Sequence, residues 1–200
     1  MSKTIELIFD FVSPNAYLVW QPLHELASRQ NAEIKITPVF LGGMHKLTGN
    51  TPPFIRDADV KGKNNYAMLE MQRFIAKYRL KRFKMNPKFP FNSVNLLRML
   101  LSLGANDQIK FIETMLSAIW EQELDVSDPV AVAAVLTASG FDAERLAKQT
   151  QDAEIKQALI DNTELAVKRG TFGIPTFFIG GEMFFGKERL GQMEEMLEKS

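Results

Sequence analysis

The sequence predicts an α/β protein in which a mixed sheet of four strands is interrupted along the chain by a large helical block. Three observations lead to this prediction. Runs of β-forming residues occur near both ends of the chain, apolar residues in the middle recur at helical spacing, and a Gly-Gly pair joins two short apolar runs close to the C-terminus. The predicted order is therefore β-α-β, then helices, then β-β-α.

The N-terminal β-α-β unit is predicted from residues 4–40. Residues 4–9 (TIELIF) and 33–40 (EIKITPVF) are rich in β-forming residues, which is typical of strands. A helix connects them, as in a β-α-β crossover. Its apolar positions keep the spacing of one helix face: Ala16, Val19, Trp20, Leu23, Leu26 and Ala27.

The middle of the chain is predicted to be helical after a long loop. Residues 45–63 are polar, contain prolines and show no steady period, which indicates a long ordered loop of the kind that often carries function. Helical patterns then follow one another over residues 64–168. We therefore divide the chain into a sheet domain of residues 1–45 and 165–200 and an inserted loop and helical domain of residues 46–164.

The C-terminal β-β-α unit completes the predicted sheet. Residues 175–179 (PTFFI) and 182–185 (EMFF) are expected to form a hairpin, because Gly180-Gly181 suits a two-residue turn. Residues 187–198 are expected to form the last helix, with Leu190, Met193 and Leu197 as its apolar positions.

Composition and charge limit the classes of function. The chain has 200 residues, 46% of them hydrophobic, which is enough for a sizeable core. Its 24 basic and 24 acidic residues cancel, so we expect a small molecule or a protein as partner and neither nucleic acid nor a membrane. The chain shows no signal peptide pattern and no apolar stretch long enough to span a bilayer, so we expect a cytoplasmic protein.

The cysteine and histidine counts restrict the chemistry further. The chain has no cysteine, which excludes disulfides and a cysteine nucleophile, and two histidines are too few for a histidine-rich metal site. We therefore predict no metal, and any thiol chemistry must come from a bound molecule.

The predicted layout is that of a thioredoxin-like fold with a helical insertion, and several motifs match a known family. The matching stretches are DFVSPNAYL, GNTPP, NPKFPFNS and GTFGIPTFFIGGEMFFGKERL. With these motifs in the same order over residues 5–197, the chain resembles the 2-hydroxychromene-2-carboxylate isomerase family. That family is similar to kappa-class glutathione transferases and, more remotely, to DsbA-type oxidoreductases.

The resemblance implies glutathione as a cofactor, with its sulfur beside Ser13. In the redox relatives this turn carries Cys-x-x-Cys, whereas this chain has Ser13 and Ala16 and cannot exchange disulfides by itself. In the family it resembles, the serine hydroxyl contacts the glutathione sulfur. A free thiol has a pKa of about 8.5, and a hydroxyl donor at the start of a helix favours the thiolate. The alternative is that Ser13 only caps the helix.

Two C-terminal stretches are also implied to bind glutathione. In the resembling families the bond before Pro175 is cis and the backbone of Ile174 pairs with the cysteinyl backbone; the alternative is a proline at the start of an edge strand. Lys187 and Glu188 begin the last helix, where relatives bind the γ-glutamyl end, usually with Ser-Asp or Gln-Asp. Glu188 is one methylene longer than aspartate, and the alternative is a glutamate that interacts with the helix dipole.

The polar loop supplies further candidates. Asn50 matches a family position that contacts glutathione, and Lys63 best matches the basic residue that binds the glycyl carboxylate, with Lys61 as its rival. Lys46, Arg56 and Lys63 could also hold an anionic substrate. The alternative for each of them is a solvated surface position.

The stretch of residues 86–93 is expected to run beside the cleft. Phe89 and Phe91 could line an aromatic substrate pocket, although an aromatic residue at the start of a helix is more often part of the core. Asn92 could face the ligand or cap the following helix.

The function that the resemblance implies is a glutathione-dependent isomerase of aromatic (naphthalene-type) degradation. It would convert 2-hydroxychromene-2-carboxylate, a small aromatic carboxylate, to trans-o-hydroxybenzylidenepyruvate, and it would be a homodimer like its relatives. Two alternatives stay open. One is a kappa-class-like glutathione transferase or peroxidase that acts on other electrophiles and consumes glutathione, and the other is a non-catalytic glutathione-binding thioredoxin-like module.

Overall fold

The strands at the two ends of the chain form one mixed sheet, as predicted. The computed structural model describes residues 3–199, so residues 1–2 and 200, the ends of the predicted sheet domain, lie outside the described residues. Within residues 3–199 the strand order is β2-β1-β3-β4; β1 and β2 are parallel, and β3 is antiparallel to both β1 and β4. The strands are β1 (Lys3–Phe9), β2 (Ala32–Pro38), β3 (Thr176–Ile179) and β4 (Glu182–Phe185).

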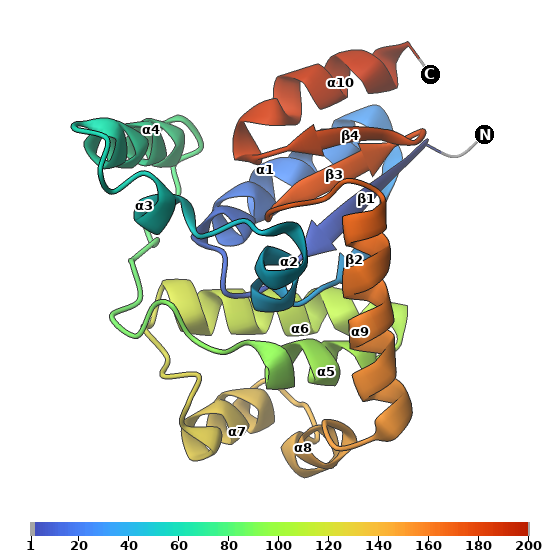
Figure 1. The fold of residues 1–200 in the computed structure, drawn as a ribbon. Coiled ribbons are helices and arrows are strands. Elements are labelled where there is room, and N and C mark those ends of the chain that lie inside the picture. The colour runs from blue at the N-terminus through green and yellow to red at the C-terminus, as the bar shows by residue number, and fades with distance from the viewer. Residues whose placement is uncertain (1–2, 200) are drawn as a thin grey trace.

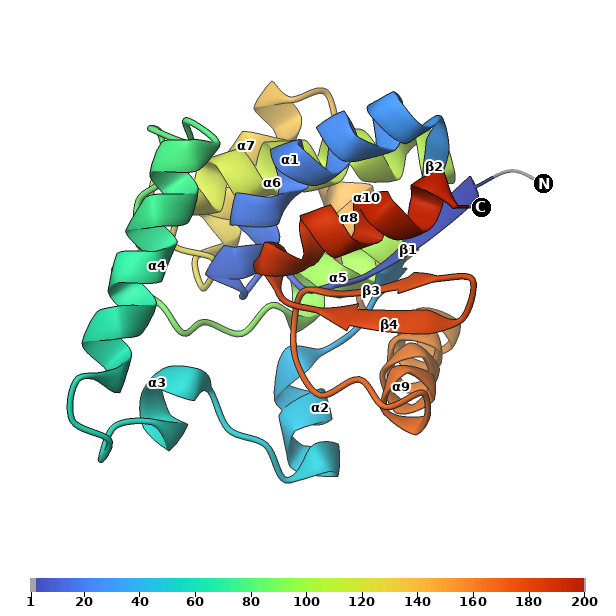
Figure 2. The same cartoon turned by 90° about the horizontal axis from the view of Figure 1, so that it is seen from above.

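The sheet is covered by helices from both ends of the chain and from the insertion (Figures 1 and 2). Helix α1 (Pro14–Gln30) packs against β1, β2 and α10 (Leu190–Glu198), and α10 also contacts β3. Residues 187–189 of the predicted last helix form a 3₁₀ turn, η1 (Lys187–Arg189), ahead of α10. Four side chains of the central strand β1 are fully buried: Ile5, Leu7, Ile8 and Phe9.

The middle of the chain is helical, as the apolar spacing predicts. Three of its helices begin at an aspartate whose side chain accepts hydrogen bonds from first-turn N–H groups, the usual helix start: Asp128, Asp142 and Asp152. The predicted domain boundary at 164/165 falls inside the last of these helices, and the boundary at 45/46 falls inside helix α2 (Leu41–Thr48). The helices are α5 (Val94–Leu101), α6 (Ala105–Trp120), α7 (Pro129–Ala138), α8 (Ala143–Gln149) and α9 (Ala153–Lys168).

The prediction of one long loop over residues 45–63 is wrong. The segment contains the end of α2 (Leu41–Thr48), the short helix α3 (Pro53–Arg56) and the first residue of α4 (Lys63–Lys77). The sequence of α2 shows no repeating apolar pattern, because two glycines follow Leu41 and Met44 is its one buried residue. Gly49 ends it in the left-handed conformation, at φ 68°. Helices α3 and α4 extend away from the sheet (Figure 2).

No helix within residues 3–199 has the length and apolar character needed to cross a membrane.

Candidate functional site

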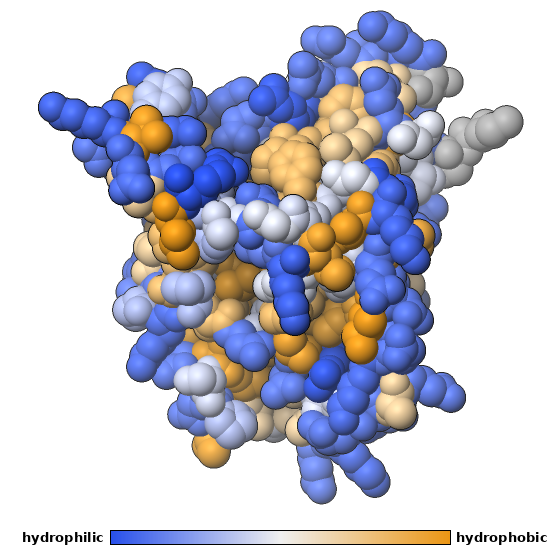
Figure 3. Space-filling model, in the orientation of Figure 1, coloured by the Kyte–Doolittle hydropathy of each residue, from blue (hydrophilic) through white to orange (hydrophobic). Residues whose placement is uncertain are grey.

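A pocket of about 400 Å³ lies where the turn after β1, helices α2 and α3, and the turn before β3 meet. Figure 3 shows apolar side chains gathered in the middle of the face that carries these elements. Residues predicted from distant parts of the sequence line this pocket together: Ser13, Asn50, Arg56, Phe89, Phe91, Asn92 and Ile174. The pocket is therefore the candidate functional site.

Ser13 lies at the N-terminal end of α1 and is 5% exposed. Its hydroxyl makes no capping hydrogen bond to α1 in the described chain. It donates instead to the carbonyl oxygen of Ile174, at 3.1 Å. Pro14 and Asn15, the first residues of α1, also line the pocket, so the positive end of the helix lies beside the hydroxyl. The Ser13 hydroxyl thus joins the two turns that the motifs predict to meet.

The turn before β3 has the backbone form that the resemblance implies. The Ile174–Pro175 peptide bond is cis. The Thr176 hydroxyl donates to the Gly173 carbonyl at 2.7 Å, which closes the turn. A Cβ atom at Gly173 would lie 2.8 Å from the Phe185 ring, so a larger residue here would have to displace that ring.

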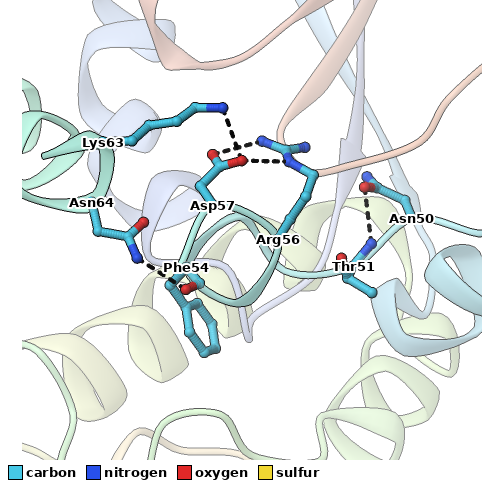
Figure 4. A network of polar contacts seen from close by, with 7 residues as sticks. All are labelled: Asn50, Thr51, Phe54, Arg56, Asp57, Lys63 and Asn64. Carbon is cyan, nitrogen blue, oxygen red and sulfur yellow. Dashed lines mark hydrogen bonds and ion pairs between the residues drawn. The ribbon is translucent and has the colours of Figure 1, made fainter. Parts of the chain in front are cut away.

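Asn50 connects the segment after α2 to the same turn. Its side-chain Nδ2 donates to the carbonyl oxygen of Phe172 at 2.8 Å, and its Oδ1 accepts from the N–H of Thr51 at 2.9 Å (Figure 4 shows the second bond). The Asn50 side chain therefore positions residues 172–174 at the pocket as well as lining it.

A fully buried carboxyl group, Asp10, lies under the pocket at the end of β1. Its Oδ1 accepts from the N–H of Val12 at 3.1 Å, and its Oδ2 accepts from the N–H of Leu41 at 2.8 Å. Burial raises the pKa of Asp10 to about 6, and these hydrogen bonds oppose the rise. Asp10 thus connects the Ser13 turn to the start of α2.

The basic residues of the polar stretch form an ion-pair network (Figure 4). The Arg56 guanidinium contacts both oxygens of Asp57, at 2.9 and 3.1 Å, and the Lys63 ammonium lies 2.9 Å from Asp57 Oδ1. Arg56, and secondarily Lys63, hold the pKa of Asp57 well below its usual range. Arg56 lines the pocket, whereas Lys63 reaches it only through Asp57. The network keeps one positive charge in excess beside the pocket.

Lys187 and Glu188 face a different pocket. They line a cavity of about 220 Å³ together with Phe74 and Arg73 of α4. The Lys187 ammonium is paired with the Glu188 carboxylate and lies 5.4 Å from the centre of the Phe74 ring. The two residues are close in sequence to Phe185, which lines the Ser13 pocket, but they do not line that pocket themselves.

The remaining predicted residues differ in their placement. Lys46 and Lys61 are exposed and do not line the Ser13 pocket. Phe89 has both expected roles, because it lines the pocket and its ring centre lies 6.0 Å from that of the buried Trp120. Asn92 also has both, since it lines the pocket and its Oδ1 accepts from the N–H of Val94 at 3.0 Å, at the start of α5.

Sequence reasoning missed two polar residues of the pocket. Asn15 contributes a buried Oδ1 that has no hydrogen-bond partner within residues 3–199. His45 of α2 lines the pocket, and burial lowers the pKa of its imidazole, so the ring is neutral near pH 7. His45 lies four residues after Leu41, so recognition of α2 as a helix would have placed it beside the pocket.

The pocket combines hydrogen-bonding groups with positive charge. A buried hydroxyl and the start of α1 lie together, and Arg56 brings positive charge that can attract a carboxylate. By contrast, the structure over residues 3–199 contains no cluster of three His, Cys, Asp or Glu side chains able to hold a metal ion.

Comparisons with known proteins identify the family of the chain. The family model of the DSBA-like thioredoxin domain matches residues 4–198. A 2-hydroxychromene-2-carboxylate isomerase from Sphingobium xenophagum is 27% identical over 197 residues, covering 98% of this chain and 99% of that protein. A glutathione S-transferase kappa 1 from Rattus norvegicus is 25% identical, covering 98% of this chain and 91% of that protein.

Solved structures show the same fold. The structure of a 2-hydroxychromene-2-carboxylate isomerase superimposes with a TM-score of 0.83 at 25% identity, covering 98% of this chain and 95% of that one. The oxidoreductase DsbA from Xylella fastidiosa gives a TM-score of 0.62 at 13% identity, covering 99% of this chain and 86% of that one, which supports the fold alone.

Proposed function

The chain belongs to the family of DSBA-like thioredoxin domains, and from that premise we propose that it is a glutathione-dependent isomerase of small aromatic carboxylates. The specific reaction proposed is the conversion of 2-hydroxychromene-2-carboxylate to trans-o-hydroxybenzylidenepyruvate. One observation carries the proposal: a buried serine hydroxyl occupies the turn between β1 and α1 and reaches the backbone of Ile174 across the pocket. The similarity to three isomerases at 27% identity supports the choice of reaction.

Bound glutathione would supply a reversible thiolate nucleophile, which allows a conjugated double bond of the ring-opened substrate to become a rotatable single bond. Ser13 would stabilise the negative charge on sulfur by donating its hydroxyl proton, with help from the positive end of α1. In the structure the hydroxyl donates to the Ile174 carbonyl, so it must turn from that carbonyl to the sulfur. Binding of the thiolate therefore breaks the neutral hydrogen bond between the Ser13 hydroxyl and the Ile174 carbonyl.

The other predicted residues would hold the ends of the tripeptide. Asn50 keeps residues 172–174 in place, so that the backbone of Ile174 can pair with the cysteinyl residue. The excess positive charge of Arg56 and Lys63 would attract the glycyl carboxylate or the carboxylate of the substrate. Because Lys187 and Glu188 line a neighbouring pocket, binding of the γ-glutamyl end there requires glutathione to extend past Phe185.

A substrate pocket follows from the remaining walls. Phe54 and Phe89 have ring centres 5.6 Å apart and line the Ser13 pocket, so they offer an aromatic surface to a ring. His45 is a neutral imidazole in the same pocket and could carry a proton to or from the substrate phenol. Without His45, the phenol would exchange this proton with water. The homodimer and the cytoplasmic location that were predicted from the sequence stay predictions.

A spectrophotometric isomerase assay tests the proposal. The protein is incubated with 2-hydroxychromene-2-carboxylate alone, with glutathione, and with S-methylglutathione, which keeps the peptide but has no thiol. We expect formation of the trans product with glutathione and none above background with S-methylglutathione. A stable glutathione conjugate would favour the transferase alternative, which the kappa-class similarity supports. Binding of glutathione without any turnover on either substrate class would favour a non-catalytic module.

A further inference from the structure

A second pocket lies outside the candidate site, in the helical insertion. Its volume is about 520 Å³, within the usual range of small-molecule sites, and it is formed between α5, α7 and α8 (Figure 1 shows these helices). It shares Asn92 with the Ser13 pocket, and its other lining residues are different.

The walls of this pocket are mainly apolar. Buried side chains from two helices face it, with Leu96 and Met99 from α5 and Val132 and Leu136 from α7. Alanine residues of α7 and α8, including Ala133, complete the lining and leave the space open. Such a surface favours the apolar body of a ligand.

One cation, Arg98, lines this apolar pocket without a charged partner. Its Nη1 makes a long hydrogen bond, 3.4 Å, to the Thr150 carbonyl at the end of α8. Its Nε is buried and has no hydrogen-bond partner among residues 3–199, and in that same range no carboxylate forms an ion pair with Arg98. A half-buried guanidinium without a counter-charge is unfavourable, and a carboxylate in the cavity that pairs with the guanidinium supplies that counter-charge.

We propose that the pocket between α5, α7 and α8 binds a small apolar monocarboxylate, whose carboxylate pairs with Arg98 and whose body packs against α5 and α7. This site is independent of the proposed glutathione chemistry. Aliphatic and aromatic carboxylates both combine an apolar body with a carboxylate, so the experiment uses one probe of each kind.

Isothermal titration calorimetry with octanoate and with 2-naphthoate tests the proposal, and 1-octanol serves as the uncharged control. We expect at least one of the two carboxylates to bind in a 1:1 ratio, while 1-octanol binds at least about tenfold more weakly, because hydrogen bonds to charged groups typically contribute this much. Preference for octanoate or for 2-naphthoate identifies the aliphatic or the aromatic source. Equal binding of the carboxylate and the alcohol would overturn the proposal.

Four variants locate the site. Arg98→Met should weaken carboxylate binding roughly tenfold or more. Arg98→Lys should weaken it less, because lysine keeps the positive charge but lacks the planar set of N–H donors of the guanidinium. Ala133→Phe, which fills the pocket and leaves Arg98 in place, should also weaken binding, and it keeps the test valid if Arg98→Met does not fold. Arg56→Met, in the Ser13 pocket, should leave octanoate binding unchanged and should remove only the part of 2-naphthoate binding that belongs to the Ser13 pocket. Loss in Arg56→Met with wild-type binding in Ala133→Phe would place the carboxylate in the Ser13 pocket and overturn the proposal.

Discussion

Replacing Ser13 with alanine separates the role of its hydroxyl in folding from its role at the sulfur. The hydroxyl donates to the Ile174 carbonyl at 3.1 Å in a buried position. Ser13→Ala leaves that carbonyl without its donor, so we expect a loss of about 1–3 kcal/mol in the free energy of unfolding. Urea denaturation without glutathione measures this loss.

The effect on the bound thiolate is smaller than a simple count of hydrogen bonds gives. A hydrogen bond to a charged group contributes about 1.5–3 kcal/mol, but the hydroxyl must first give up its neutral bond to Ile174, which contributes about 0.5–1.5 kcal/mol. The net stabilisation of the thiolate is therefore roughly 0–2.5 kcal/mol, and its centre of about 1.2 kcal/mol corresponds to roughly one pKa unit and about tenfold in rate. We expect Ser13→Ala to raise the pKa of bound glutathione by about one unit and to leave most of its affinity intact.

Ultraviolet absorbance of the thiolate, followed against pH in the complex, measures this shift. Ser102→Ala is a matched control, because the Ser102 hydroxyl also donates to a backbone carbonyl, that of Met99 at 2.7 Å, but lies outside the Ser13 pocket. The control should leave the thiolate pKa unchanged. An unchanged pKa and unchanged turnover in Ser13→Ala would refute the reasoning and leave Ser13 as a structural residue at the start of α1.

Three further predictions follow from the contacts around the pocket. Burial raises the pKa of Asp10 to about 6, above its value near 3.8 in the unfolded chain. The folded protein therefore holds this proton more tightly, and the stabilising contribution of Asp10 to the free energy of unfolding is present below about pH 4 and lost as the pH rises through 6. Asp10→Asn should therefore remove a decline of roughly 3 kcal/mol in unfolding free energy between pH 4 and 7, and an identical slope in denaturation of both proteins would contradict this. Asn50→Ala should cost about 0.5–1.5 kcal/mol through the lost bond to the Phe172 carbonyl and should weaken glutathione binding in calorimetry; unaltered affinity would exclude a role for Asn50 in positioning the turn. Glutathione should raise the melting temperature more than cysteinylglycine does, and Glu188→Gln should reduce that difference; equal shifts from both ligands would exclude the γ-glutamyl assignment.

The sheet could be predicted because its signals are local. Residues 4–9 are rich in β-forming side chains. Gly180-Gly181 defines the hairpin, and the two glycines have φ of 56° and 92° in the structure. The meeting of Ser13 with Ile174 could be predicted only from the resemblance, since 161 residues separate them.

The rest of the site depends on contacts that have no local pattern. The ion pair of Lys63 with Asp57 arises because the short helix α3 turns Asp57 toward the start of α4. Helix α2 itself is not visible in the sequence, because it buries one side chain, so the position of His45 in the pocket was missed. The separation of Lys187 from the Ser13 pocket likewise follows from packing against Phe74 of α4, which sequence spacing does not encode.

The measurement that tests the central claim most directly is the amount of trans product formed per glutathione. The protein is given 2-hydroxychromene-2-carboxylate in large excess over glutathione, and both the product and the free thiol are counted at the end. If glutathione acts as a cofactor held at Ser13, many substrate molecules isomerise for each glutathione and the thiol is recovered in full. Product that stops at one equivalent of glutathione, or that forms equally well without it, would contradict the account.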